Sequence, residues 1–101
     1  MNGKIYKLQC NTGHYYYGST VQSLRQRLSG HKYDSKRYKY HVYDFINTIG
    51  WDNVAIVLVE NHKCDTKQDL LLRECELIRP SLDDPMCLNT PVYQFKKESD
   101  Q

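Results

Sequence analysis

One glutamate of this chain falls where a helix normally buries apolar side chains. Residues 66–78 have a helical spacing of leucine, isoleucine and cysteine, and Glu74 lies in the middle of the apolar arc that runs from Leu77 through Leu70 and Leu71. Glu76 falls on the polar side instead. A carboxylate in a buried stripe costs several kcal/mol unless it is paired, hydrogen-bonded or bound to a metal. Glu74 is therefore an ion-pair partner, a protonated core residue or a metal ligand.

Arg27 and His31 form a second candidate pair, because they are one helical turn apart on a segment whose apolar residues are Leu24 and Leu28. An arginine can bind a phosphate with two hydrogen bonds, and a nearby histidine can donate a hydrogen bond or transfer a proton. The alternative is two solvent-facing side chains on an amphipathic helix, which the spacing alone favours.

The chain contains nine tyrosines, three of them consecutive. Strand alternation places Tyr15 and Tyr17 on one face of a sheet and Tyr16 on the other. Most of the nine fit a core or stacking role. A phenol, whose pKa is about 10, becomes a base only where cations and a metal lower that pKa.

Charge is unevenly distributed along the chain. Residues 1–41 have a net charge of +7 and residues 42–95 a net charge of −5, within an overall charge of +2. A basic half suits a polyanion such as nucleic acid, although a solvated basic face without a partner has the same composition. The side chains expected to contact nucleic acid are Lys4, Arg25, Lys32, Lys36, Arg37 and Lys39.

Length and composition narrow the class of protein. With 101 residues, 40% hydrophobic and 26% charged, we expect one globular domain over residues 1–95 and a polar tail over 96–101. No apolar run reaches the length of a membrane span, and the start of the chain has no signal-peptide pattern. The four cysteines include no Cys-x-x-Cys. We therefore expect an intracellular protein (cytoplasmic, or nuclear if eukaryotic or viral) with reduced thiols, not a membrane protein, secreted protein or zinc finger.

Periodicity and turn signals predict an α/β (α+β) fold. Ser23 would cap one helix, Gly50 would end another, and Pro80 would stop the last. The continuous apolar run from Val54 to Val59 predicts a strand covered on both faces. The order β-β-α-α-β-α indicates a small three-stranded, mainly antiparallel sheet flanked by helices. The predicted elements are strands 3–10 and 14–17 (a hairpin closed by Gly18), helices 24–33 and 39–49, strand 54–59, and a helix from Asp65 or Thr66 to Ile78.

Five short motifs follow one another along most of the chain. They are Lys4-Ile5-Tyr6, Tyr16-Tyr17-Gly18, the helix from Leu24 to His31, the segment 42–54, and the segment from Leu72 to Ile78 with Leu88-Asn89 after it. In this order and spacing they resemble the GIY-YIG nuclease family over residues 3–89. Lys4 stands where the family has glycine, and Tyr17 where a branched aliphatic residue is usual, but neither change removes a side chain that the family uses for chemistry.

The resemblance implies a GIY-YIG-like fold and a metal-dependent DNA endonuclease that uses one Mg²⁺ or Mn²⁺ ion. Glu74 would bind the metal, and Arg27 would stabilise charge on the pentacovalent phosphorus. Tyr6 or Tyr16 would take the proton from the attacking water, with assistance from His31. The resemblance does not divide these roles further.

The resemblance also implies roles around the chemistry. Asn89 would position the helix that carries Glu74, or a phosphate. Because 101 residues leave no room for a second DNA-reading domain, we expect specificity to come from the domain surface, a homodimer or a partner protein. The alternative to an enzyme is a catalytically inactive nucleic-acid-binding module with the same fold.

Overall fold

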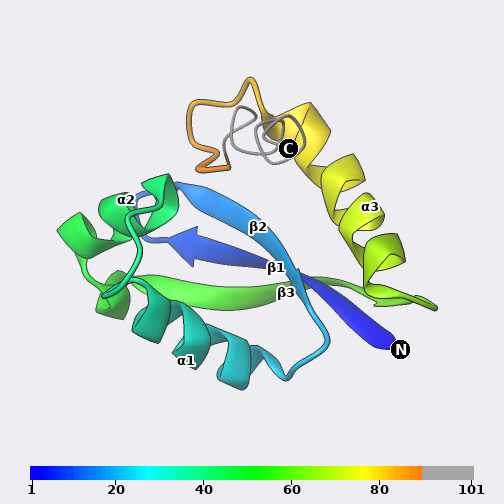
Figure 1. Ribbon diagram of the computed structural model, residues 1–101. Helices are drawn as coiled ribbons and strands as arrows, with labels where there is room; N and C mark the ends of the chain where they lie inside the picture. Colours follow the sequence, from blue (N-terminus) through cyan, green and yellow to red (C-terminus); the bar gives the residue numbers. More distant parts are fainter. Residues whose placement is uncertain (90–101) are drawn as a thin grey trace, which may run out of the picture.

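The computed structural model describes residues 1–89, which form a three-stranded antiparallel sheet with helices against both faces (Figure 1). The predicted fold class and the order β-β-α-α-β-α are confirmed. The tail predicted at 96–101, and residues 90–95 of the predicted domain, lie outside the described residues. The elements are β1 (Asn2–Cys10), β2 (Tyr15–Thr20), α1 (Leu24–Asp34), α2 (His41–Ile49), β3 (Val54–Lys63) and α3 (Lys67–Ile78), with short 3₁₀ turns at Trp51–Asn53 and Arg79–Ser81.

The strand order is β2-β1-β3, so β1 lies in the middle of the sheet. Leu8 pairs with Tyr16, and Tyr6 pairs with Gly18. Because side chains alternate, Tyr6, Leu8 and Tyr16 face one side of the sheet, where they pack with α1 and α2. Ile5 and Tyr17 face the other side and pack with α3. The predicted separation of Tyr16 from Tyr17 is thus confirmed.

The prediction that the third strand is covered on both faces is wrong. β3 is an edge strand, and Val57, Leu58 and Val59 are 40–44% exposed. A continuous apolar run is typical of a strand buried between helices, but here three helices cannot cover both faces of the sheet over its full width. β3 also continues to Lys63, beyond the predicted end at Val59.

Local signals place the helix ends well. Ser23 and Gln26 form a capping box at the start of α1, and Thr66 accepts a hydrogen bond from the backbone of Asp69 at the start of α3. Gly50 ends α2 with a φ of 90°, a conformation that favours glycine. The strand β2 does not close at Gly18 as predicted, because backbone pairing with β1 continues to Thr20.

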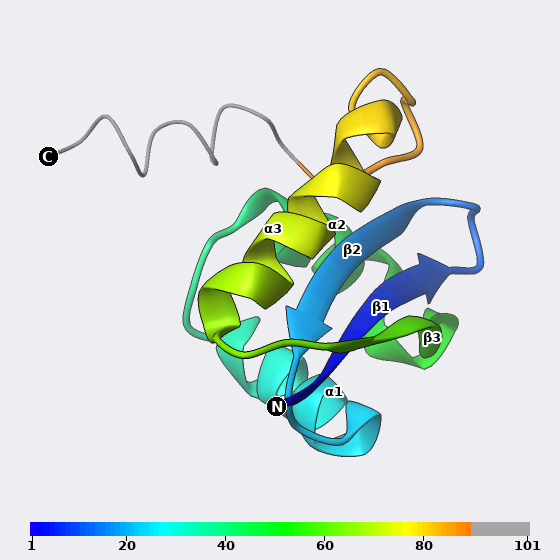
Figure 2. The same ribbon diagram turned by 90° about the vertical axis from the view of Figure 1, so that its right-hand side faces the viewer.

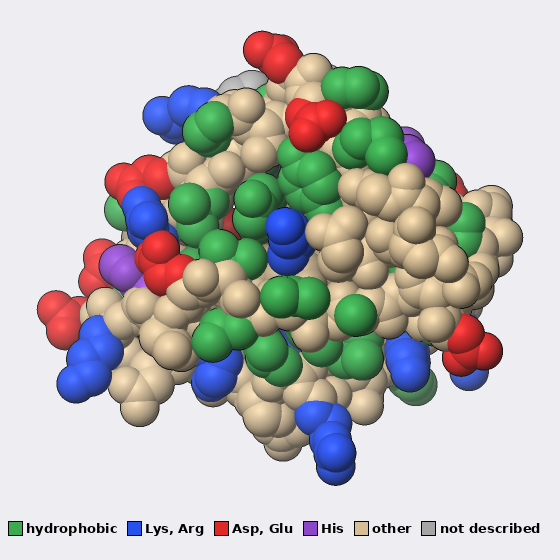
Figure 3. Space-filling model, turned by 180° about the vertical axis from the view of Figure 1, so that it is seen from behind, with side chains coloured by type: hydrophobic (Ala, Val, Ile, Leu, Met, Phe, Trp, Pro, Cys, Tyr) green, Lys and Arg blue, Asp and Glu red, His purple; other side chains and the backbone are tan. Residues whose placement is uncertain are grey.

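Figure 2 shows α3 alongside β2, with α1 and α2 on the far side of the sheet. Seen from behind in Figure 3, hydrophobic side chains gather across the middle of the visible face, and acidic side chains lie mainly toward its rim. Within residues 1–89, no helix has the length and apolar composition that crossing a membrane requires. All four cysteines lie in this part of the chain and are free thiols.

Candidate active site

The Tyr6 side chain crosses a glycine of the neighbouring strand, β2. Tyr6 pairs with Gly18, and a Cβ atom on Gly18 would lie 2.4 Å from both Cζ and Oη of Tyr6. The ring therefore lies over β2 where only a glycine leaves room, and the side chain is 1% exposed. This contact explains why Gly18 follows the tyrosine run.

His31 connects two tyrosine hydroxyls beneath the surface. Its Nε2 lies 2.6 Å from the Tyr6 hydroxyl and its Nδ1 lies 2.8 Å from the Tyr43 hydroxyl. Burial, with a smaller effect from Arg27, lowers the pKa of His31 to about 3, so the imidazole is neutral at physiological pH. A neutral imidazole has one donor and one acceptor nitrogen, so one tyrosine donates to it and the other accepts.

Arg27 is fixed to this chain of hydrogen bonds. Its Nε donates to the Tyr6 hydroxyl at 3.3 Å. Burial raises the pKa of Tyr6 to about 12, although Arg27 acts in the opposite direction, so the phenol is protonated. Arg27 and His31, whose spacing alone favoured two solvent-facing side chains, are instead both turned toward Tyr6 on the sheet.

Tyr43 is the residue that the sequence analysis missed. Burial raises its pKa to about 12, and it is 3% exposed in α2. A signal was available, because a tyrosine beside the apolar stripe of a helix needs a buried partner for its hydroxyl. That partner, His31, comes from another helix, which the spacing within α2 does not reveal.

Glu74 approaches the same region from α3. Ser19 donates a hydrogen bond from its hydroxyl to Oε1 of Glu74. Burial raises the pKa of the Glu74 carboxyl, while Ser19 and Arg27 act in the opposite direction. Arg73 pairs with Glu60 and with Glu76, and no ion pair among residues 1–89 reaches Glu74. The ion-paired alternative is therefore absent from the described part of the chain.

One detail of the predicted apolar arc around Glu74 is wrong. Leu71 was placed in the apolar arc, but it is 49% exposed. Its neighbour Leu72 is 56% exposed. The buried residues of α3 are Leu70 and Ile78, with Leu77 partly buried. Within residues 1–89, α3 packs on the sheet with one side only, so its buried arc is narrower than its apolar residues suggest.

These side chains surround a cavity of about 980 Å³ between α3, β2 and the α1–α2 region. Of the predicted catalytic residues, Tyr16, Arg27, His31, Glu74 and Asn89 line it. Tyr6 lies directly behind this wall, where its hydroxyl forms hydrogen bonds with Arg27 and His31. Leu71 and Leu72 form part of the α3 side of the wall. The tertiary structure thus collects residues from five separate segments around one space.

Asn89 holds the outer edge of β2. Its Oδ1 accepts from the backbone N–H of Tyr17 at 2.9 Å, and its Nδ2 donates to the Tyr17 carbonyl at 3.0 Å. The neighbouring Leu88 N–H donates to the carbonyl of Tyr15 at 2.7 Å. We expected Asn89 to position the Glu74 helix or a phosphate. The hydrogen bonds of Leu88 and Asn89 go to the β2 backbone, on both sides of Tyr16.

The predicted basic residues divide into two groups. Lys32, Lys36, Arg37 and Lys39 are exposed at the end of α1 and in the connection to α2, and Lys39 also lines the cavity. Arg25 lies in the first turn of α1, and Lys4 lies on β1 opposite Thr20. The structure therefore gathers four of the six basic residues around one connection.

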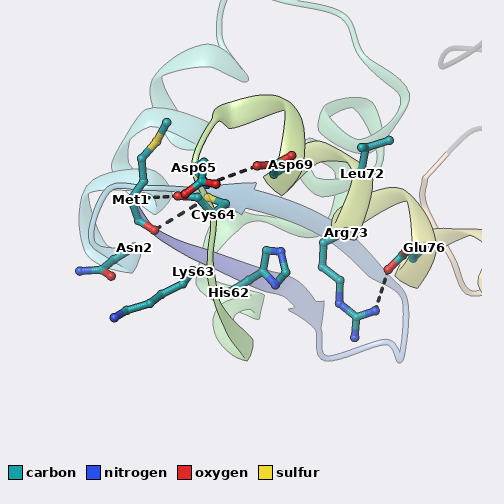
Figure 4. A pocket seen from close by; sticks show the side chains of 10 residues that line it. All are labelled: Met1, Asn2, His62, Lys63, Cys64, Asp65, Asp69, Leu72, Arg73 and Glu76. Carbon is teal, nitrogen blue, oxygen red and sulfur yellow. Dashed lines mark hydrogen bonds and ion pairs between the residues drawn. The ribbon is translucent and has the colours of Figure 1, made fainter.

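A second pocket, of about 570 Å³, lies at the start of β1, the end of β3 and the outer side of α3 (Figure 4). Two contacts shown there join the Met1 amine to the Cys64 carbonyl at 2.7 Å and Arg73 to Glu76 at 2.9 Å. None of the predicted catalytic residues lines this pocket, and Leu72 is the residue that it shares with the cavity at Glu74.

A family model of the GIY-YIG catalytic domain matches residues 2–86. The chain belongs to the GIY-YIG family. No curated protein and no solved structure gives a significant match. Membership in the GIY-YIG family means that this is a nuclease-family domain, and it implies a nucleic-acid substrate. The GIY-YIG match covers the segments that carry Tyr6, Tyr16, Arg27, His31 and Glu74.

Proposed function

We propose that this GIY-YIG domain is a metal-dependent DNA endonuclease that hydrolyses phosphodiester bonds. The observation that carries the proposal is the cavity in which Arg27 and Tyr16 share a wall with Glu74, a carboxylate without an ion-pair partner among the described residues. An arginine suits a phosphate oxygen, and a partly buried carboxylate suits a hard cation. Together they match a site for a phosphodiester.

The donor set fits one divalent metal ion. No group of three or more His, Cys, Asp or Glu side chains lies together within residues 1–89, so a closed, all-protein cage is not present there. Mg²⁺ commonly takes only one or two carboxylates and completes its coordination with water and phosphate oxygens. Glu74 would hold Mg²⁺ or Mn²⁺ in this manner. When bound, the ion stabilises charge on the phosphoryl oxygens and lowers the pKa of coordinated water.

Arg27 would bind the phosphate that is cut. Because its Nε is bonded to Tyr6, the guanidinium is held in one orientation and would present its Nη atoms to a phosphate oxygen. Stabilising charge that develops in the transition state with a preorganised donor is a large contribution to catalysis. Tyr6 and His31 are then positioning residues for Arg27.

Tyr16 is the better candidate to accept the proton from the attacking water. It lines the cavity, whereas Tyr6 is 1% exposed and its hydroxyl oxygen is bonded to Arg27 and His31. A proton acceptor must lie within hydrogen-bond reach of the water that it activates. Because Tyr16 lines the cavity, it would meet this requirement for a water bound there.

The test is a plasmid-nicking assay with and without Mg²⁺, run beside the variant Glu74→Gln. We expect nicking by the parent only when the metal is present, and none by the variant. DNA binding by both proteins without any metal-dependent cleavage would favour the alternative, a catalytically inactive nucleic-acid-binding module.

A further inference from the structure

Three tyrosine rings form a column that leads from solvent to the buried side of the cavity. The rings of Tyr38 and Tyr40 are stacked, with centroids 5.5 Å apart and planes 9° apart. Tyr40 stacks in turn on Tyr43 at 5.6 Å and 25°. Tyr38 and Tyr40 are 44% and 45% exposed, while Tyr43 is buried and bonded to His31. The column therefore has a buried, fixed base and an exposed upper part.

Cations surround the exposed part of the column. The Arg37 guanidinium lies 5.8 Å from the ring centre of Tyr38 and 5.4 Å from that of Tyr33. Lys36 and Lys39 are exposed on the same connection between α1 and α2, and residues 35–40 contain no acidic side chain. Asp34, at the end of α1, is the acidic side chain closest to this segment in the sequence and also lines the cavity. An exposed aromatic platform whose own segment carries three cations and no acidic residue complements a partner that has flat rings and negative charge.

This platform is continuous with the cavity. Lys39, Tyr40 and Tyr43 line the same space as Arg27 and Glu74. A nucleic-acid strand with a phosphate at Arg27 therefore has a neighbouring nucleotide beside the column. In a duplex both faces of a base are covered by its neighbours, so a tyrosine can stack fully only on an unpaired base.

We propose that the segment 36–40 binds an unpaired nucleotide, with its base stacked on the tyrosine column and its phosphate near Arg37 or Lys39. The consequence is a preference for DNA that has a single-stranded stretch beside the cut site over fully paired DNA. This deepens the proposed function by naming a substrate class, and it rests on that function only for the cleavage chemistry.

The test measures binding without added metal, so that cleavage does not interfere. A labelled oligonucleotide of about 16 nucleotides, the upper end of common single-strand site sizes, is compared with its duplex by fluorescence anisotropy. We expect the double variant Tyr38→Ala/Tyr40→Ala to weaken single-strand binding by roughly tenfold or more, as stacking energies imply, and duplex binding by less than about threefold. The control Tyr38→Phe/Tyr40→Phe keeps both rings and should bind like the parent.

A second readout uses the parent protein and Tyr38→Ala, the change at the outer end of the column that leaves Tyr40 on Tyr43. An oligonucleotide containing 2-aminopurine should change its fluorescence on binding to the parent and change less with the variant. An equal loss of affinity for both DNA forms in the double variant, or no loss at all, overturns the proposal. Failure of the parent to bind any single strand also overturns it.

The outcomes separate this inference from the proposed function. If the parent nicks plasmid only with metal, but the Tyr38 and Tyr40 changes have no effect on DNA binding, the inference about the tyrosine column is rejected. The endonuclease proposal then stands. Ring-dependent binding of single strands by a parent that never nicks DNA would reject the endonuclease proposal and keep the binding surface.

Discussion

Consecutive residues of α3 have different tasks because a helix turns each one to a different side. Arg73 forms two hydrogen bonds with Glu60 of β3, at 2.7 and 2.8 Å, and a third with Glu76. The two contacts with Glu60 anchor α3 to β3 on its outer side. Glu74, the next residue, faces the cavity and Ser19. The same helix therefore combines a structural ion pair with the carboxylate that we propose as the metal ligand.

The first prediction concerns Glu74. The change Glu74→Ala should abolish metal-dependent nicking and leave the free energy of unfolding unchanged or higher, because a carboxyl whose pKa burial raises destabilises the folded state in its ionised form. Nicking and urea unfolding at pH 7 measure the two effects. The control is Glu76→Ala, on the exposed side. An inactive Glu76→Ala together with an unfolded Glu74→Ala would show that the wrong glutamate has been chosen.

The second prediction separates the tyrosines by the face on which they lie. Tyr16→Phe and Tyr6→Phe should each lower the cleavage rate by roughly 10²-fold, the usual range for an acid–base or closely coupled group. Tyr17→Phe, on the opposite face, should stay within a few-fold of the parent. Single-turnover cleavage rates provide the measurement. Full activity of Tyr16→Phe would exclude Tyr16 as the proton acceptor.

The third prediction concerns acid stability. Because the pKa of His31 is about 3 in the folded protein and about 6.5 when unfolded, the unfolded chain binds the proton first on acidification. The free energy of unfolding should be unaffected by this group above about pH 6.5 and fall by roughly 1.4 kcal/mol per pH unit below it, down to about pH 3. Urea unfolding at several pH values should show a flatter dependence for His31→Gln. The exposed His41→Gln is the control, and an equally flat profile there would contradict the assignment to His31.

At the scale of elements, β2 and α1 cooperate to place the buried hydrogen-bond chain. β2 offers a glycine where the Tyr6 ring crosses it, and α1 presents Arg27 and His31 on one edge to meet the hydroxyl. The segment 86–89 then pairs with the outer edge of β2 through Leu88 and Asn89. The strand is thus held from both sides near the cavity.

The fourth prediction follows from the crossing at Gly18. The change Gly18→Ala should lower the free energy of unfolding by roughly 1–3 kcal/mol and slow cleavage, because the new methyl group would force Tyr6 away from Arg27. Urea unfolding and nicking rates test both effects. Gly30→Ala, within α1, meets only the end of the Arg27 side chain and should leave stability unchanged or raise it by up to about 1 kcal/mol. A Gly18→Ala protein as stable as the parent would contradict the steric argument.

At the scale of the whole molecule, the fold separates charges that the sequence places in two halves. Lys32, Lys36 and Arg37 surround the α1–α2 connection, and the acidic side chains of the second half include Glu60 and Glu76, which are engaged by Arg73. A nucleic acid that enters the cavity from the α1–α2 side therefore meets cations first. Such contacts would release counterions, so we expect the binding constant to depend on salt.

The fifth prediction uses that dependence. Replacing Lys32, Lys36 and Arg37 together by glutamine should reduce the slope of log K against log salt concentration by about 2 to 3, since each phosphate contact contributes about 0.9. Anisotropy titrations at several salt concentrations give the slope. The matched control is Lys63→Gln/Lys67→Gln, at the far end of β3 and the start of α3. An unchanged slope in the triple variant would place the DNA on another surface.

The sequence by itself determined the element order, most helix ends, the opposite facing of Tyr16 and Tyr17, and the position of Glu74 within the buried side of α3. These follow from local physics: capping groups, glycine at positive φ, and the periods of helix and strand act over a few residues. The motifs were also local, and their order was enough to indicate the family that the catalytic-domain match then showed.

Only the tertiary structure decided which distant groups meet. The exposure of β3 depends on how far three helices extend across the sheet, and the partners of Asn89 depend on where the chain returns to β2. The bond from Tyr43 to His31 joins two helices. Such contacts reflect packing between elements, which no local period encodes, and burial there sets the pKa values of Tyr6 and His31. Five cavity residues, Tyr16, Arg27, His31, Glu74 and Asn89, were named from the sequence. The part played by Tyr43, the shared space and the protonation of the buried groups required the fold.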